Sequence, residues 1–326
     1  MNGVFDLGIK VVLALQGLGG WLTAPMQFFS FLGTEQFFLV LLPALYWCVS
    51  ESVGLQVGVM LLLSTTVNDA LKLALHGPRP YWYSPSVKQL ATETSFGVPS
   101  GHAQISAGVW GVMAAGLKKG WAWLVAGIVV FLIGLSRMYL AVHFPHDVLV
   151  GWLVGGLLLW LVLRFWSPAA AWLNGLSLGR QVLAAFLASL VMILVELVPY
   201  LWLKLSGWQP PQAWAAYAGQ AVTLSGAFTA AGVFFGLTSG LAGMRPLGGF
   251  SAAGSLWKRI LRYLLGLVGV LVFYLGLDLL FGLIVPDGEA ALPYLLRYVR
   301  YALVGAWLTF GAPWLFVRLG LAEKAG

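Results

Sequence analysis

Residues 101–142 decide the fold, and they read GHAQISAGVWGVMAAGLKKGWAWLVAGIVVFLIGLSRMYLAV. Two apolar runs, 101–118 and 121–142, lie on either side of the short basic turn Lys118-Lys119-Gly120. Each run is long enough to cross a bilayer as an α-helix, which needs about 17–25 apolar residues. A pair of helices joined by a tight turn returns the chain to the membrane face from which it started. The pattern therefore predicts an all-α membrane protein.

The chain as a whole is strongly apolar. Of its 326 residues, 60% are hydrophobic and 9% are charged, whereas soluble domains carry roughly 25% charged residues. Apolar runs recur along nearly the whole sequence, so we expect a polytopic helical bundle of about nine transmembrane helices. The expected spans are 33–50, 53–76, 101–118, 121–142, 146–166, 180–204, 217–241, 260–285 and 294–318. The amphipathic stretch 1–20 is expected at the membrane interface.

The basic residues indicate the orientation of the chain. The formal net charge is +7, which in a membrane protein is typical of Lys and Arg in cytoplasmic loops and not of nucleic-acid binding. We expect the N-terminus outside and the C-terminus in the cytoplasm, with Asp287 and Glu289 on the outer side. The basic residues then expected on the cytoplasmic side are Lys118, Lys119, Arg164, Arg180, Arg245, Lys258, Arg259, Arg262, Arg318 and Lys324. The opposite orientation would place the lysine pair and the cluster at 258–262 outside, so it ranks lower.

Three short motifs concentrate polar chemistry in one part of the chain. All four histidines fall between positions 76 and 146. The motifs are Lys72 followed after six residues by Arg79-Pro80, then Pro99-Ser100-Gly101-His102, then Ser136-Arg137 followed by His143 and Asp147. Ionisable residues within membrane segments are costly and are usually functional. The concentration therefore predicts a site.

The spacing of the motifs predicts that they meet at one membrane face. His102 and Ser136 are 34 positions apart, a distance that two spans of about 17 residues and the basic turn would use. Lys72 ends a span that runs toward the outer face, and the loop 77–100 leads from there to the second motif. We therefore expect all three motifs at the outer surface.

The residue types fit the binding of an anion such as phosphate. Ser100 is suited to cap a helix, and Gly101 lets the backbone approach a ligand closely. The N–H groups at this helix start would then point at the anion. Lys72, Arg79 and Arg137 would add a compact charge and bidentate contacts to the phosphoryl oxygens.

His143 lies just before an expected helix. Pro145 is suited to the first turn of a helix, which places Asp147 within that turn. The Asp147 carboxylate can accept a hydrogen bond from one ring nitrogen of His143 and leave the other nitrogen free to attack. His146 raises the alternative of a metal site, but no third ligand lies at helical spacing, so we expect no metal.

In order and spacing, the three motifs resemble the signature of the type 2 phosphatidic acid phosphatase superfamily. This superfamily includes lipid phosphate phosphatases, undecaprenyl diphosphate phosphatases and glucose-6-phosphatases, and the resemblance covers about residues 68–151. It implies a six-helix phosphatase core within residues 1–170 and additional membrane helices in 171–326, together in one membrane domain. It also implies hydrolysis without a cofactor, with His143 as the nucleophile that forms a phosphohistidine and His102 as the acid and base.

Four further residues are expected around the site. Asn68 lies one helical turn before Lys72, and we expect it to orient the lysine. Tyr81, Trp82 and His146 resemble residues of the glucose-6-phosphatase branch, which also has a similar layout of spans. We expect these four residues to support the catalytic groups and not to react themselves.

The resemblance leaves the substrate open. Asp147 is the acid typical of lipid phosphatases, whereas glucose-6-phosphatases have Gln there, so the leading hypothesis is hydrolysis of lipid phosphate monoesters or isoprenyl diphosphates at the extracytoplasmic side. Sugar-phosphate hydrolysis is the second hypothesis, and transfer of the phosphoryl group to another lipid is a variant. A lipid transporter or scramblase without catalysis belongs to another class.

The helices from 180 onward could shape a lipid groove or form a homodimer contact, and Glu196 and Asp278 have no assigned role.

Overall fold

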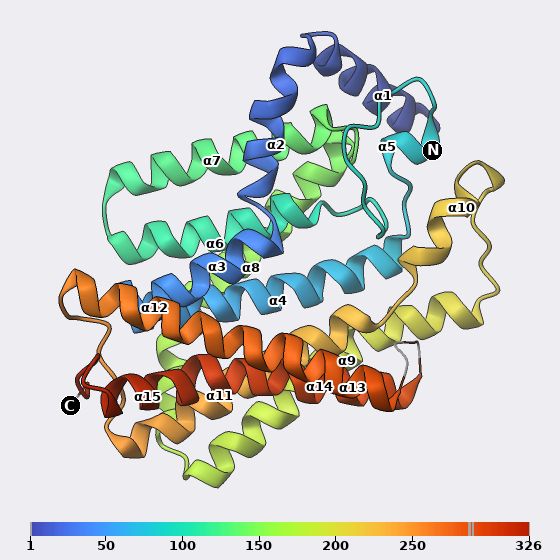
Figure 1. Ribbon diagram of the computed structural model, residues 1–326. Coiled ribbons are helices and arrows are strands. Elements are labelled where there is room, and N and C mark those ends of the chain that lie inside the picture. Colours follow the sequence, from blue (N-terminus) through green and yellow to red (C-terminus); the bar gives the residue numbers. More distant parts are fainter. Residues whose placement is uncertain (1, 286–287, 289, 326) are drawn as a thin grey trace. The chain divides into compact units, whose positions relative to one another are not determined.

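The structure is a computed structural model that describes residues 2–285, 288 and 290–325. It is helical, and no β-strand occurs within these residues, which confirms the all-α prediction (Figure 1). The long helices are α1 (Asn2–Gln16), α2 (Thr23–Phe31), α3 (Glu35–Ala44), α4 (Glu51–Leu75), α6 (Gly101–Leu117), α7 (Gly120–Tyr139), α8 (Pro145–Asn174), α9 (Leu178–Leu205), α11 (Ser225–Met244), α12 (Leu256–Leu271), α13 (Leu277–Ile284), α14 (Ala291–Ala306) and α15 (Ala312–Arg318). Two short helices, α5 (Pro80–Tyr83) and α10 (Ala215–Ala218), lie in connecting segments.

Several helices are long and apolar enough to cross a membrane. The described residues contain six such stretches, or seven if α1 and α2, which meet at a 90° bend, form one span. The six are 51–83, 120–139, 145–174, 178–205, 212–247 and 256–284. The chain is therefore a multi-pass membrane protein, as its composition predicts. The expected spans 33–50, 101–118 and 294–318 are helical but are not among the six, so the number nine stays a prediction.

The chain folds into two compact units, each built from three stretches of sequence. One unit comprises residues 1–38, 67–162 and 195–223, and the other comprises residues 39–66, 163–194 and 224–326. Residues of α4, α8 and α9 contribute to both units. All three motifs lie in the first unit. The expected division at residue 170 stays a prediction, and Asp287 and Glu289 lie outside the described residues.

The hairpin of α6 and α7 forms at the stretch that the sequence marks (Figure 1). Ser100 caps the start of α6, where its Oγ accepts a hydrogen bond of 3.4 Å from the backbone N–H of Ala103. At the other end, Lys118 adopts a left-handed conformation with φ of +52° and closes the tight turn. Ala114 and Ala122 are buried where the two helices pack. Small side chains let the two helices of the hairpin approach closely.

The N-terminal parts of α6 and α8 pack against each other because α8 carries glycine at the contact. A Cβ atom at Gly151 would lie 2.7 Å from the backbone oxygen of Ser100, and one at Gly155 would collide with the backbone oxygen of Gln104. Only glycine leaves room for the α6 backbone at these two positions. The two helix starts that carry the second and third motifs are therefore adjacent.

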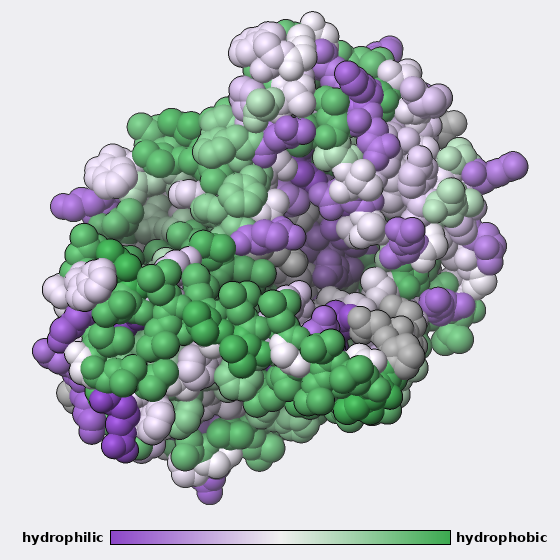
Figure 2. Space-filling model, viewed as in Figure 1, coloured by the Kyte–Doolittle hydropathy of each residue, from purple (hydrophilic) through white to green (hydrophobic). Residues whose placement is uncertain are grey.

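The second unit packs its helices in the same manner and presents an apolar exterior. A Cβ atom at Gly232 on α11 would lie 2.5 Å from the backbone oxygen of Tyr298 on α14. Figure 2 shows hydrophobic residues covering the visible face of α12 and α13, where Leu264, Leu279 and Leu283 are exposed. An exposed surface rich in large apolar side chains is typical of a protein that faces lipid.

Candidate active site

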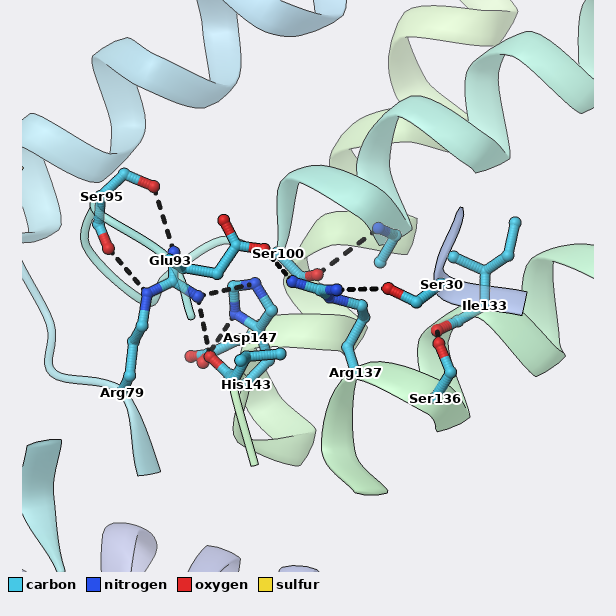
Figure 3. Close-up of polar contacts among 12 residues, drawn as sticks. Ser30, Arg79, Glu93, Ser95, Ser100, Ile133, Ser136, Arg137, His143 and Asp147 are labelled. Carbon is cyan, nitrogen blue, oxygen red and sulfur yellow. Dashed lines mark hydrogen bonds and ion pairs between the residues drawn. The ribbon is translucent and has the colours of Figure 1, made fainter. Parts of the chain in front are cut away.

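Four helix ends of the first unit meet at the candidate site. α4 and α7 end there, and α6 and α8 begin there. The backbone N–H of Ser100 donates to the backbone oxygen of Asp147 at 2.9 Å. Nδ2 of Asn68, on α4, donates to the backbone oxygen of Pro99 at 3.3 Å. These contacts bring residues of all three motifs into one cluster (Figure 3).

His143 is held between a carboxylate and a guanidinium group. Its Nδ1 is 3.3 Å from Oδ2 of Asp147, and its Nε2 is 3.2 Å from Nη1 of Arg79 (Figure 3). A guanidinium group only donates hydrogen bonds, so Nε2 is the acceptor and the ring proton lies on Nδ1. Oδ2 of Asp147 also accepts a hydrogen bond of 2.9 Å from the backbone N–H of Phe144. The ring is thereby fixed with the lone pair of Nε2 directed into the cationic cluster.

Burial keeps the imidazole of His143 neutral. The residue is 1% exposed. Burial lowers the pKa of His143 well below its usual value of 6.5, and the positive charges of Arg79, Arg137 and Lys72 lower it further. In the neutral form Nε2 carries no proton and keeps its lone pair, so the surroundings favour a nucleophile at this position.

The turn between α7 and α8 sets the position of His143. Ala141 in this turn has φ of +61°, a left-handed conformation that is uncommon for a residue with a Cβ atom. Phe144 is fully buried and packs against Phe5 of α1, with ring centroids 5.1 Å apart. The packing of the turn holds the strained residue in place and leaves His143 facing Arg79.

Arg79 has every donor occupied by the protein. Its Nε donates to the backbone oxygen of Ser95 at 2.7 Å, and Nη2 donates to Ser95 Oγ and to the backbone oxygen of Phe96, each at 3.1 Å. Nη1 donates to the backbone oxygen of Val142 at 2.8 Å and to His143. A guanidinium group has five N–H bonds, and these contacts use all five. Arg79 is fully buried and joins the loop before α6 to the turn before α8.

Lys72 has donors to spare. Its Nζ donates to Ser95 Oγ at 2.8 Å, and an ammonium group has three N–H bonds. The group lies beside the start of α6, because a Cβ atom at Gly101 would be 3.7 Å from Nζ. Lys72 can therefore reach an anion bound at the N-terminus of α6.

Arg137 is the third cation, and it pairs with an acid. Its guanidinium group donates to Ser30 Oγ and to a carboxylate oxygen of Glu93. Within the described chain its buried Nε has no hydrogen-bond partner. Arg137 thus keeps a donor that a phosphoryl oxygen could accept from.

Glu93 belongs to the loop between α5 and α6, and we did not predict it from the motifs. The hydroxyl of Tyr81 fixes its backbone, because it donates to Glu93 O at 3.0 Å and accepts from Glu93 N at 3.2 Å. Burial raises the pKa of Glu93, but the charges of Arg137 and three other basic side chains outweigh burial and lower that pKa to about 2. The carboxylate is therefore ionised. One signal could have revealed it, since Glu93 is the only acidic residue between positions 77 and 100.

His102 lies in the first turn of α6 and is partly buried. A Cβ atom at Gly33 would lie 3.2 Å from Cδ2 of His102. Its ring forms no hydrogen bond with the part of the chain that the structure describes. A positive charge on His102 would lower the pKa of both Glu93 and His143, so its imidazole lies near both groups. His102 is thus free to exchange a proton with a bound molecule.

Asn68 supports the site in a way that differs from our expectation. Its Nδ2 donates to Gln104 Oε1 at 2.9 Å and to the backbone oxygen of Pro99. The amide therefore reaches across to the start of α6 and does not hold Lys72. The two acceptors near the start of α6 fix the direction of Nδ2.

Trp82 and His146 lie at the edge of the cluster. The indole of Trp82 lies under Arg79, with 6.0 Å from Cζ to the ring centroid, and it stacks on Tyr217 at 5.5 Å. His146 stacks on Phe144 at 5.2 Å, and its Nε2 is 3.2 Å from Oδ1 of Asp147. No group of three or more His, Cys, Asp and Glu side chains that could hold a metal ion occurs among the described positions.

Asp278 and Glu196 are the two carboxylates to which the sequence assigns no role. Asp278 on α13 pairs with Arg300 on α14, whose guanidinium group also lies over the rings of Tyr274 and Tyr301. Glu196 on α9 is buried, and its Oε1 has no hydrogen-bond partner within the described residues. The pair at Asp278 joins two helices, and Glu196 stays without a role.

Comparison with known proteins identifies two family matches. Residues 53–170 match the PAP2 superfamily, and residues 228–324 match the PAP2 superfamily phosphatase transmembrane extension. The first match contains all three motifs. The second covers the C-terminal helices, from the first turn of α11 to beyond the end of α15.

Individual relatives are similar over part of their length. Glucose-6-phosphatase 3 of Homo sapiens is 32% identical over 187 residues, which are 50% of this chain and 54% of that protein. Glucose-6-phosphatase catalytic subunit 1 of Haplochromis nubilus is 33% identical over 147 residues, which are 36% of this chain and 40% of that protein. The chain thus spans about half the length, or less, of these curated relatives. A transmembrane PAP2 type phosphatidylglycerolphosphate phosphatase from Bacillus subtilis has a solved structure that is 29% identical, with a TM-score of 0.46 over 52% of this chain and 88% of that chain.

Proposed function

Because this chain belongs to the PAP2 superfamily, we propose that it is a membrane phosphatase that hydrolyses lipid phosphate monoesters or isoprenyl diphosphates. One observation carries the proposal: Nε2 of His143 faces Nη1 of Arg79 at 3.2 Å while Nδ1 faces Asp147. A neutral imidazole whose lone pair points into a cationic cluster meets the chemical requirement for attack on phosphorus. The apolar exterior supports a substrate that is itself held in the membrane.

The first step transfers the phosphoryl group to the protein. Lys72 and Arg137 bind the phosphoryl oxygens together with the backbone N–H groups at the start of α6. Nε2 of His143 gives up its hydrogen bond from Nη1 of Arg79 and forms a bond to phosphorus as the bond from phosphorus to the leaving oxygen breaks. The freed N–H of Arg79 then donates to a phosphoryl oxygen. His102, in its protonated form, gives its proton to that oxygen, and Asp147 stabilises the positive charge that develops on the His143 ring.

The second step returns His143 to its starting form. His102 is now neutral and takes a proton from a water molecule, whose oxygen attacks phosphorus. The bond between phosphorus and Nε2 breaks, and inorganic phosphate leaves. His143 is again neutral, with its remaining proton on Nδ1 toward Asp147. In this scheme cationic side chains supply the charge stabilisation, and no metal is required.

We place the site on the extracytoplasmic side of the membrane, with the C-terminus in the cytoplasm. The turn that carries Lys118 and Lys119 lies at the opposite end of α6 and α7 from the site. Basic turns are enriched on the cytoplasmic side, which favours this orientation. A homodimer through the C-terminal helices stays a prediction, which the exposed apolar faces of α12 and α13 would permit.

Sugar-phosphate hydrolysis is the second candidate function. The similarity to glucose-6-phosphatases, at 32% and 33% identity, favours it. The acid at Asp147 favours the lipid hypothesis, as argued from the sequence. Both candidates use the same groups and the same two steps, so the substrate alone distinguishes them.

Phosphate release by the purified protein in detergent and EDTA tests the proposal. The substrate panel contains phosphatidate, an isoprenyl diphosphate, a sphingoid phosphate and glucose 6-phosphate. We expect release from a lipid substrate in EDTA and loss of release in His143→Ala and His102→Ala. Loss of activity with the chelator, or full activity in His143→Ala, would contradict the mechanism.

The same panel separates the other hypotheses. Turnover of glucose 6-phosphate well above that of the lipids would establish the sugar-phosphate function. Label that passes from a donor into another lipid, and not into free phosphate, would indicate phosphoryl transfer. Lipid translocation that survives both histidine substitutions would indicate a transporter.

A further inference from the structure

The three cations of the candidate site contact one short segment, residues 93–96. Lys72 donates to the hydroxyl of Ser95, and Arg79 donates to Ser95 and to the backbone oxygen of Phe96. Arg137 pairs with the carboxylate of Glu93. The segment therefore supplies oxygen acceptors to the groups that we expect to bind the oxygens of phosphate.

The acceptor on Arg137 differs from the others because it is an anion. Lys72 and Arg79 meet hydroxyl and carbonyl oxygens on this segment, which are neutral. Glu93 is ionised and is close enough to all three cations for their charges to act on it. Its side chain is 27% exposed, whereas that of Arg137 is 3% exposed. The carboxylate thus lies at the open side of the cluster, between solvent and a buried guanidinium group.

We propose that the Glu93 carboxylate occupies the place on Arg137 where an oxygen of the phosphoryl group binds, and that the phosphoryl group of the substrate displaces it. This inference rests on the proposed function for the identity of the substrate. Phosphate and carboxylate compete for the same donors because both are oxygen anions that pair with guanidinium. The unpartnered Nε of Arg137 leaves a further donor for the incoming group.

The displacement requires only side-chain movement. The hydroxyl of Tyr81 holds both the backbone N–H and the backbone oxygen of Glu93, so the backbone stays in place. The carboxylate is at the end of three rotatable bonds and can turn toward solvent at its exposed side. Arg79 cannot yield in this way, because its acceptors are mainly backbone oxygens of the buried loop and turn.

The competition between Glu93 and the substrate for Arg137 predicts that the protein selects substrates by their charge. Each substrate must replace a full negative charge on Arg137, so a dianionic monoester or a diphosphate displaces Glu93 more readily than a singly charged diester does. Without a ligand, the carboxylate also reduces the repulsion among three cations in a buried cluster. Glu93 would therefore select substrates by charge, as a specificity-determining residue and not as a reacting group.

Calorimetric titration with inorganic phosphate tests the inference without any turnover. Glu93→Gln keeps the shape of the side chain and removes its charge. Because charge-assisted hydrogen bonds are roughly twice as strong as neutral ones, we expect the phosphate dissociation constant to fall about tenfold. Tyr81→Phe releases the backbone of Glu93 and should lower the constant about two- to threefold. Asp6→Asn removes an exposed carboxylate elsewhere in the same unit and should leave the constant unchanged.

The outcomes decide between this inference and the proposed function. The inference is overturned if Glu93→Gln binds phosphate with the wild-type affinity or more weakly. It is also overturned if neither the wild-type protein nor the variant binds phosphate. If Glu93→Gln does not fold, Tyr81→Phe decides in the same way. A wild-type protein that binds phosphate but releases none from any substrate of the panel overturns the proposed function alone.

Discussion

Asp147→Asn would remove one negative charge from beside His143 and keep the shape of the side chain. A single oxygen, Oδ2, accepts from the backbone N–H of Phe144 at 2.9 Å and faces Nδ1 of His143 at 3.3 Å. An asparagine oxygen in the same place can accept both hydrogen bonds. The amide nitrogen would then take the position of Oδ1, next to His146. The substitution therefore isolates the effect of charge from that of geometry.

The magnitude follows from the burial of the pair. His143 is 1% exposed and Asp147 is 0% exposed, so water does not screen their interaction. A hydrogen bond to a charged group contributes about 1.5–3 kcal/mol, compared with about 0.5–1.5 kcal/mol for a neutral one. The imidazole becomes positive as Nε2 attacks, so the loss of about 1–2 kcal/mol falls on the transition state. We therefore expect the first step to slow about 5- to 30-fold, at about 1.4 kcal/mol per factor of ten.

Rapid-quench measurement of the acid-labile phosphoenzyme, formed from radiolabelled phosphatidate in a single turnover, reads this step directly. His146→Gln is the matched control, because it changes the other neighbour of the carboxylate and should slow the step less than threefold. Formation of the phosphoenzyme at the wild-type rate in Asp147→Asn would refute the role of the charge. A fall beyond about 10³-fold would mean that the amide nitrogen faces Nδ1 and imposes the wrong tautomer.

Three other predictions concern stability and pH. Gly151→Ala places a Cβ atom 2.7 Å from the backbone oxygen of Ser100 and should destabilise the protein by about 1–3 kcal/mol in thermal unfolding, whereas Gly156→Ala, with no atom within 4 Å, should not. Burial lowers the pKa of His143 well below 6.5, so the neutral nucleophile persists as the pH falls. The acid limb of kcat/KM should therefore lie below pH 6.5, after correction for the phosphate pKa of about 6. An acid limb at or above pH 6.5 would contradict that assignment. The pKa of Glu93 is about 2 in the folded protein against an ordinary value of 4.5. Its contribution to stability should therefore be complete above pH 4.5 and be lost as the pH falls toward 2. Glu93→Gln should flatten this part of the plot of unfolding temperature against pH.

The hairpin at the centre of the first unit could be predicted nearly to the residue. The apolar runs 101–118 and 121–142 became α6 and α7, because the length of an apolar run and a basic turn with glycine are local signals. The difference is at the end of α7, which stops at Tyr139 and leaves a turn before His143. Ala141 is left-handed in that turn. Neither glycine nor asparagine marks the position, so the sequence carries no signal of the break.

The motif residues could be named from their spacing, but their partners could not. Glu93 and Arg137 are 44 positions apart, and their contact depends on the path of a loop without periodic pattern. Ser95 is one of several serine residues in that loop, and only the structure distinguishes it from the others. The contact of Ser30 with Arg137 depends on α2, in a stretch that we did not assign to a membrane span. Contacts of this kind follow from tertiary packing, which local patterns do not encode.

The nature of these partners explains how a buried site can hold three cations. A carboxylate beside each cation would fix its position but would also cancel its charge. Lys72 and Arg79 instead meet hydroxyl, carbonyl and imidazole acceptors, which fix the side chains and leave their charge in place. Neutral acceptors recover part of the free energy that these cations lose on leaving water, and a bound dianion can recover the rest. Arg137 forms an ion pair with the carboxylate of Glu93, and the side chain of Glu93 is 27% exposed and able to turn away. If the proposed displacement of Glu93 is correct, the positive charge of Arg137 becomes fully available only when a more highly charged anion binds.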